Sequence, residues 1–217
     1  MAGTTIEFIT EQVELSEQLT AGRDTMLEPQ DLPGRFGRAV KAVDHVLQAM
    51  QSEALLAGGW AVWRHGFPER LTRDIDVVLA ADTVEEFLRV ASYSGFEVLP
   101  QVPGRWPKLR HKDSGVKVDI LPEGQRPGIA SKLAPTTIRH PKQMGASGAS
   151  LRYIVLPALV ELKIAAGRPQ DEVDVIALIR AHPGELNSIR QHLQSIHQDY
   201  VSEFDRLVLR AQKEEER

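Results

Sequence analysis

Two stretches decide the fold of this chain: ALLAGGWAVWRHGFPERLTRDIDVVLA at residues 54–80 and VKVDIL at residues 116–121. The first has a Gly-Gly pair between a short apolar run and a helix-like segment, followed by Asp-Ile-Asp inside a strand-like apolar run. The second places Asp119 between two apolar residues. A carboxylate inside an apolar strand is costly unless something compensates it. We therefore expect a divalent metal ion where these strands meet.

The spacing of the acidic residues supports this interpretation. Asp74 and Asp76 are two positions apart, so on a strand their side chains share one face while Ile75 points into the core. Asp119 can reach that face from a neighbouring strand. Three carboxylates at one sheet edge suit Mg²⁺, or Mn²⁺ in its place. Two ions roughly 3.5–4 Å apart would hold the attacking and leaving oxygens of an in-line displacement, with Asp76 bridging them.

The Gly-Gly pair predicts a seat for phosphate. Residues 54–57 have the character of a short buried strand, and residues 60–65 that of the first turns of a helix. Gly58 and Gly59 at this junction would let backbone N–H groups approach an anionic ligand closely. Simpler alternatives exist for each part, since a Gly-Gly pair is often an ordinary turn and Asp119 could be a structural hydrogen-bond acceptor.

The order of these parts resembles the nucleotidyltransferase superfamily, which has the polymerase-β-like fold. Ala57-Gly58-Gly59 and Asp74-Ile75-Asp76-Val77 fit its pattern, with the 14 residues 60–73 between them. Thr72-Arg73 before the first Asp is similar to the AbiEii/AbiGii toxin-like branch. The resemblance implies an α/β (α+β) fold, with a small mixed sheet flanked by helices and a C-terminal helical part. It also implies that Thr72 and Arg73 contact the nucleotide.

A second block, LPALVELKIAAGRPQDEVDVIALI at residues 156–179, resembles a helical motif of the same branch. Its members here are Lys163, Arg168, Asp171 and Asp174. The resemblance implies that Lys163 is catalytic and binds substrate phosphate as a point charge, and that Arg168 and Asp171 complete the nucleotide-binding region and hold it together. Locally the same residues fit an amphipathic helix, with Asp171 capping the next helix. Gln170 and Pro169 depart from the usual motif.

These features predict an enzyme that uses Mg²⁺ and an NTP. An acceptor hydroxyl, deprotonated near Asp119, would attack the α-phosphorus and release pyrophosphate. The resemblance favours RNA, such as tRNA, or protein as the acceptor, and a toxin with an antitoxin partner. Two alternatives are a transferase acting on a small molecule such as an aminoglycoside, and a catalytically silent module that binds a nucleotide or a partner.

Charge is distributed unevenly along the chain. The net charge is −4, yet residues 101–143 contain nine Lys or Arg against three acidic residues. This basic segment flanks Asp119 and could steer an anionic triphosphate or RNA end towards the metals. Solvated loop charges are the equally simple alternative. Trp106, within this segment, could stack on a base or pack at the rim of a site.

Composition sets the outer limits. With 217 residues and 42% apolar residues, the chain can form a packed core. It has no cysteine, which excludes disulfides and thiolate metal sites. It shows no secretory signal and no apolar run of transmembrane length, so we expect a cytoplasmic protein without a membrane partner.

The pattern of apolar residues predicts three parts. Residues 1–30 form a tail or one short helix (11–18), residues 31–125 form the nucleotidyltransferase core, and residues 126–217 form a linker and a helical part. In the last part we expect one long helix over residues 185–214.

Overall fold

The computed structural model describes residues 10, 13–14, 17–18, 20–21, 26–70, 72–129, 132–147 and 150–215. Its centre is a six-stranded mixed sheet with the order β3-β4-β5-β2-β1-β8, accompanied by a two-stranded hairpin of β6 and β7. The strands are β1 (Ala54–Leu56), β2 (Asp74–Leu79), β3 (Phe96–Val98), β4 (Lys108–His111), β5 (Lys117–Pro122), β6 (Gly128–Ile129), β7 (Lys132–Leu133) and β8 (Leu151–Tyr153).

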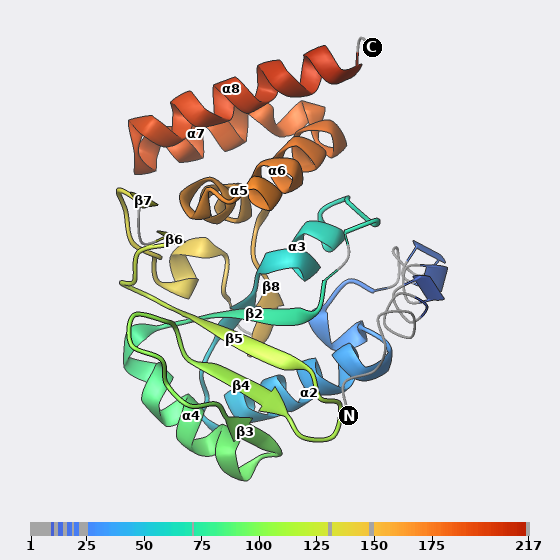
Figure 1. Ribbon diagram of the computed structural model, residues 1–217, viewed down its shortest axis with the longest axis vertical. Coiled ribbons are helices and arrows are strands. Elements are labelled where there is room, and N and C mark those ends of the chain that lie inside the picture. Colours follow the sequence, from blue (N-terminus) through green and yellow to red (C-terminus); the bar gives the residue numbers. More distant parts are fainter. Residues whose placement is uncertain are drawn as a thin grey trace.

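Helices cover both faces of the sheet. They are α2 (Gly34–Ala49), α3 (Gly58–Arg64), α4 (Val84–Tyr93), α5 (Leu156–Ala166), α6 (Pro169–Ala181), α7 (Leu186–Ile196) and α8 (Gln198–Glu215). Figure 1 shows α2 and α4 on one side of the sheet and α5 to α8 stacked on the other. The predicted α/β architecture, a mixed sheet flanked by helices with a helical C-terminal part, is confirmed.

The alternation along β2 and β5 separates an apolar face from a polar one. Ile75, Val77, Val118 and Ile120 are completely buried in the cluster that includes α2 and α4. The residues between them, including Asp76 and Asp119, point to the opposite face. That face lies towards α5, because the cluster of the C-terminal helices also contains Leu55, Ala61 and Val78. The sheet therefore packs its apolar face on α2 and α4 and turns its carboxylates towards the helical part.

The helix expected over residues 185–214 is two helices. His197 adopts an extended backbone (φ −163°, ψ 137°), which ends α7 at Ile196. Its Nδ1 accepts a hydrogen bond from the N–H of Asp199 at 3.1 Å and so caps the start of α8. A single helix of this length would extend for about 45 Å, whereas the break lets α7 pack against α5 and lets α8 pack against both α5 and α6. Leu193 and Phe204 are buried in the shared cluster as a result.

Two other expectations concern less regular parts of the chain. The linker predicted at the start of residues 126–217 contains β6, β7 and a short 3₁₀ helix at Pro141–Met144. The short helix expected at residues 11–18 falls largely outside the described residues. Among the described residues, no helix combines the length and apolar character needed to span a membrane.

Candidate active site

The acidic residues of the two deciding stretches lie on adjacent parallel strands. In the β2–β5 register Asp76 is the direct partner of Asp119, and Asp74 is the partner of Lys117. Partners in register have Cβ atoms about 4.5–5.5 Å apart, so Asp76 and Asp119 stand side by side on one face. From the strand alternation the sequence predicted only that Asp119 could reach this face from a neighbouring strand; the register itself comes from the structure. Asp74 lies two residues before Asp76, on the same face of β2.

The Gly-Gly pair makes room for the residues around it. Gly58 has φ +62°, and a Cβ at this position would lie 1.7 Å from Oδ2 of Asp76. A Cβ on Gly59 would lie 2.7 Å from both Cβ and Oγ1 of Thr72. Any larger residue would therefore displace the Asp76 carboxyl or the loop before β2. The helix that follows has only seven residues, so the predicted phosphate seat depends on the glycine backbone and stays a prediction.

Lys108 is a member of the site that the sequence did not single out. It opens β4 and is the register partner of Asp119 across the antiparallel β4–β5 pair. Its Nζ donates to Oδ2 of Asp119 in an ion pair. The other carboxyl oxygen, Oδ1, is buried and has no hydrogen-bond partner among the described residues. The signal in the sequence was weak, because only the antiparallel register brings KLRH opposite KVDIL.

A cavity of about 610 Å³ opens on this face, between the sheet, α5 and the β6–β7 hairpin. Its polar lining includes Gly58, Asp76, Asp119, Lys108, Arg105, Arg126, Lys163, Arg168 and Asp171. Its apolar lining includes Trp106, Leu121, Leu133, Ile138, Leu159 and Leu162. The structure thus brings residues from the predicted core and from the 156–179 block to one cavity. Thr72 and Arg73, both predicted to bind nucleotide, are not among the residues that line it.

Thr72 and Arg73 differ in burial and in their contacts in this structure. Thr72 is buried beneath Gly59, and its hydroxyl donates a hydrogen bond of 3.3 Å to the backbone oxygen of Asp74. It therefore supports the start of β2. The side chain of Arg73 is exposed.

Lys163 lies in a buried ion network at the base of the cavity. Its side chain is 5% exposed, and its Nζ donates to Oδ1 of Asp171 at 3.0 Å and to Oδ2 of Asp174 at 2.6 Å. Arg70, which the sequence did not single out, donates from Nε to Oδ1 of Asp174 at 2.7 Å. This contact ties α6 to the loop that leads into β2. The phosphate-binding role predicted for Lys163 stays a prediction, because here its ammonium is engaged by two carboxylates.

Arg168 and Asp171 organise the start of α6. Asp171 accepts hydrogen bonds from the backbone N–H and the Nε of Arg168, at 3.2 and 2.7 Å. Burial raises the pKa of the Asp171 carboxyl, but the bonds from Arg168 and the charge of Lys163 outweigh it and hold that pKa below its usual range. Asp171 is thus a helix cap, as the local alternative suggested, and it also turns the Arg168 guanidinium towards the cavity.

Three comparisons place this geometry among known proteins. The family described as Aminoglycoside-2''-adenylyltransferase matches residues 39–128, the segment that contains Gly58, Gly59, Asp74, Asp76 and Asp119. The chain is a nucleotidyltransferase that uses an NTP. No curated protein matches it.

Two solved structures are similar. One is a crystal structure of ANT(2")-Ia in complex with adenylyl-2"-tobramycin, with 14% identity and a TM-score of 0.45 over 82% of this chain and 97% of that one. The other is a solution structure of ANT(2'')-Ia, with 14% identity and a TM-score of 0.40 over 81% and 91% of the two chains. With both TM-scores below 0.5, neither similarity supports a conclusion about the substrate.

The electrostatics of the nucleotidyltransferase site favour a bound cation. Burial raises the pKa of the Asp76 carboxyl to about 7, with further contributions from the neighbouring charges of Asp74 and Asp119. Lys163 and Arg168 oppose this shift but do not cancel it. A cation beside Asp76 would oppose this shift and lower the pKa again, since it stabilises the ionised form.

The side chains also fit a divalent ion chemically. Asp76 and Asp119 supply oxygen ligands, and Oδ1 of Asp119 is a buried acceptor without a partner in the described part of the chain. Gly58 leaves the space beside Oδ2 of Asp76. Within the described residues no group of three His, Cys, Asp or Glu side chains is gathered closely enough to hold a metal ion. Asp76 and Asp119 are therefore the pair that fits, and Asp74 remains a predicted third ligand.

Proposed function

We propose that this nucleotidyltransferase moves a nucleoside monophosphate from an NTP to a hydroxyl group of a small-molecule acceptor. One observation carries the proposal: Asp76 and Asp119 are register partners in the wall of a cavity of about 610 Å³, beside a Gly-Gly turn that makes room for one of them. Pockets of roughly 300–1,000 Å³ are typical for small ligands. The match to Aminoglycoside-2''-adenylyltransferase over residues 39–128 supports a small acceptor over a polymer.

Asp76 and Asp119, with Asp74 as the third candidate, would hold Mg²⁺. When bound, this ion would neutralise charge on the phosphates and the attacking oxygen. Gly58 and Gly59 would present backbone N–H groups to the triphosphate. The carboxylate of Asp119 would take the proton of the acceptor hydroxyl, whose oxygen then forms a bond to the α-phosphorus as pyrophosphate leaves. Catalysis would rest on positioning and electrostatics, as is usual for this chemistry.

The wall opposite the carboxylates suits an organic group. Leu159 and Leu162 of α5, together with Trp106 and Ile138, supply apolar surface next to the charged residues. Either the nucleobase or a ring of the acceptor could pack there. The C-terminal helical part would thus complete a site whose carboxylates come from the sheet.

An RNA or protein acceptor is the second candidate. Arg105 and Arg126 line the same cavity with exposed side chains, and both belong to the basic segment 101–143. This surface would suit a polyanion. The hypothesis that the enzyme is a toxin with an antitoxin partner rests on the sequence motifs alone, since none of the comparisons concerns a toxin.

The test is transfer of label from each of the four α-³²P-labelled NTPs with Mg²⁺. Parallel reactions would contain a panel of aminoglycosides and other hydroxylated antibiotics, total tRNA, or cell protein. Label on a small molecule would support the proposal, and label on tRNA or protein would support the second candidate instead. The Asp76→Asn variant is the matched control, and undiminished transfer by this variant would refute the assigned site.

A further inference from the structure

Lys108, Asp119 and Asp76 form a row across three adjacent strands. The antiparallel register pairs Lys108 with Asp119, and the parallel register pairs Asp119 with Asp76. All three side chains line the same cavity. The row places one cation at the end of a pair of carboxylates that would otherwise face each other without compensation. This arrangement is a property of the pairing of the strands and not of a flexible surface loop.

The ion pair satisfies only part of the Asp119 carboxylate. Lys108 engages Oδ2, whereas Oδ1 is buried without a partner among the described residues. An unsatisfied buried acceptor is costly, so Asp119 retains capacity for a second cation. The two side chains are 41% and 20% exposed, for Lys108 and Asp119 respectively. The lysine can therefore leave, since its side chain is partly exposed and lines the cavity.

Lys163 cannot act in the same way. It is 5% exposed and held by two carboxylates, Asp171 and Asp174. Leaving either would remove one counter-charge from a buried carboxylate and would break a buried ion network, which is unfavourable. Lys108 has one partner and partial exposure, and an ammonium is a compact charge on a flexible chain. Of these two lysines, Lys108 is thus the one that can exchange with an incoming ion.

We propose that Lys108 is a displaceable counter-charge, which neutralises Asp119 in the metal-free enzyme and gives up this carboxylate when a divalent cation enters. The inference rests on the proposed function only in requiring that Asp76 and Asp119 bind such a cation. Its consequence is that a bare metal ion binds weakly, because it must displace an existing ion pair. A metal ion that arrives with a triphosphate brings extra contacts that offset this cost. Lys108 would therefore couple metal binding to nucleotide binding.

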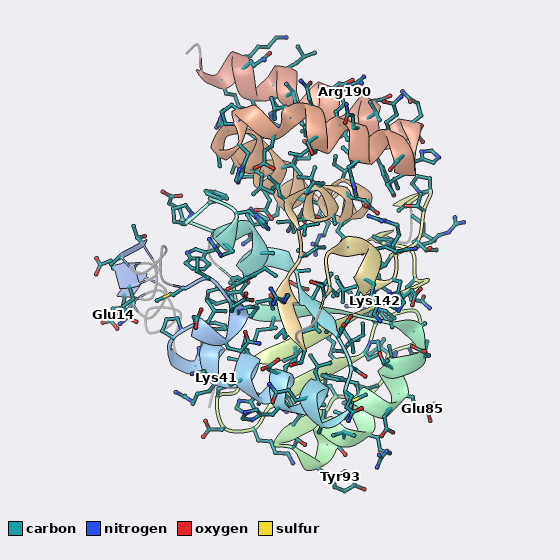
Figure 2. The ribbon with its side chains drawn as sticks, turned by 180° about the vertical axis from the view of Figure 1, so that it is seen from behind. Glu14, Lys41, Glu85, Tyr93, Lys142 and Arg190 are labelled. Atoms are coloured by element: carbon teal, nitrogen blue, oxygen red, sulfur yellow. The ribbon has the colours of Figure 1, made fainter. Side chains whose placement is uncertain are left out.

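The experiment measures Mn²⁺ binding to the full-length protein without nucleotide, by the electron paramagnetic resonance signal of free Mn²⁺. Lys108→Met keeps the length of the side chain and removes its charge, so Mn²⁺ should bind about tenfold more tightly than in the wild type. Lys41→Met is the control, because Lys41 lies exposed on α2 (Figure 2), and α2 packs on the face of the sheet opposite the carboxylates. Its affinity should equal that of the wild type. An unchanged or weaker affinity in Lys108→Met would overturn the proposal.

A second variant keeps the proposal testable if Lys108→Met folds poorly. Lys108→Arg retains the charge and offers Asp119 a bidentate partner, so Mn²⁺ should bind several-fold more weakly than in the wild type. Tighter or unchanged binding would contradict the exchange. In an Asp119→Asn background, Lys108→Met should no longer change the affinity, because the contested ligand is gone. A persisting tenfold effect there would show that Lys108 acts through another group.

These measurements separate the inference from the proposed function, since they involve neither an acceptor nor turnover. Melting temperatures supply a further readout. In EDTA, Lys108→Met should melt a few degrees lower than the wild type, because Asp119 loses its counter-charge. With saturating Mn²⁺ the difference should disappear. A difference of equal size in both conditions would assign Lys108 a purely structural role and would refute the exchange.

Discussion

Carboxylates lie away from bulk solvent in two regions of this molecule, fully buried in the helical part and half-buried at the sheet face, and they are compensated differently in the two regions. In the helical part, Asp171, Asp174 and Glu161 each have cationic partners at hydrogen-bond distance. At the sheet face, Asp76 has a pKa raised to about 7, and one oxygen of Asp119 lacks a partner in the described chain. Compensated carboxylates hold elements together, whereas undercompensated ones are poised for a ligand. The difference distinguishes the scaffold from the site.

The largest expected effect is on catalysis at the sheet face. Asp76→Asn should lower transfer by about 10³-fold or more, because one of the two paired carboxylates in the cavity wall would no longer bind a cation as an anion. The same change should raise the free energy of unfolding in EDTA at pH 8, by about 1 kcal/mol, since it removes one of three neighbouring negative charges. Label transfer and urea unfolding measure the two effects. A destabilised variant would show that the Asp76 carboxylate stabilises the fold. The proposed difference between the sheet face and the helical part would then be wrong.

Lys163→Met should have its main effect on stability. It leaves Asp171 and Asp174 buried with fewer counter-charges, and breaking a buried ion network typically costs about 3–5 kcal/mol. Urea unfolding monitored by circular dichroism would measure the loss. Lys213→Met, at an exposed position on α8, is the control and should be neutral. A stable Lys163→Met protein with a raised KM for the NTP would instead support the phosphate-binding role predicted for Lys163.

Glu161 offers a test that depends on pH. It accepts hydrogen bonds from Arg139 at 3.1 and 2.6 Å and contacts Nε2 of His192 at 2.7 Å. Burial raises its pKa, but His192 and Arg139 outweigh burial and hold the pKa below the ordinary value of 4.5. A carboxylate with a lowered folded pKa stabilises the protein above its unfolded pKa and loses this contribution as the pH falls through the folded one.

Glu161→Gln should therefore cost about 2 kcal/mol at pH 7, and the difference from the wild type should shrink towards pH 3. Glu86→Gln is the control, since Glu86 pairs with Arg89 at the surface and should show no measurable change. Unfolding free energies at several pH values measure both variants. A gap for Glu161→Gln that widens in acid would contradict the assigned direction.

The smallest effect concerns Trp106, which lies at the boundary between the two regions. It lines the cavity and packs partly buried against the cluster of C-terminal helices. Trp106→Ala should raise the KM for the NTP or the acceptor by about fivefold, as expected for one lost stacking contact of about 1 kcal/mol. Tyr93→Ala, at an exposed position on α4, is the control. An unchanged KM for both substrates would exclude Trp106 from the binding surface.

Much of the fold and the centre of the site followed from local patterns. Alternation along residues 74–79 and 117–121 correctly placed Asp76 and Asp119 on one face, because strand geometry fixes that face residue by residue. Lys108 and Arg70 were missed because their partners, Asp119 and Asp174, are set by strand register and helix packing. The break at His197 was also missed, since the apolar spacing continues through it and only tertiary packing favours two helices.

The row formed by Lys108, Asp119 and Asp76 has a consequence for how the sheet assembles. Because side chains alternate along a strand, a slip of β5 by one residue would turn Asp119 into the layer now filled by Val118. It would also present an apolar side chain to Lys108. Such a mispaired chain would bury an uncompensated charge beneath α2 and α4. The acidic residues of the proposed site thereby penalise wrong strand pairings, so that the correctly assembled sheet and the arrangement of this site form together.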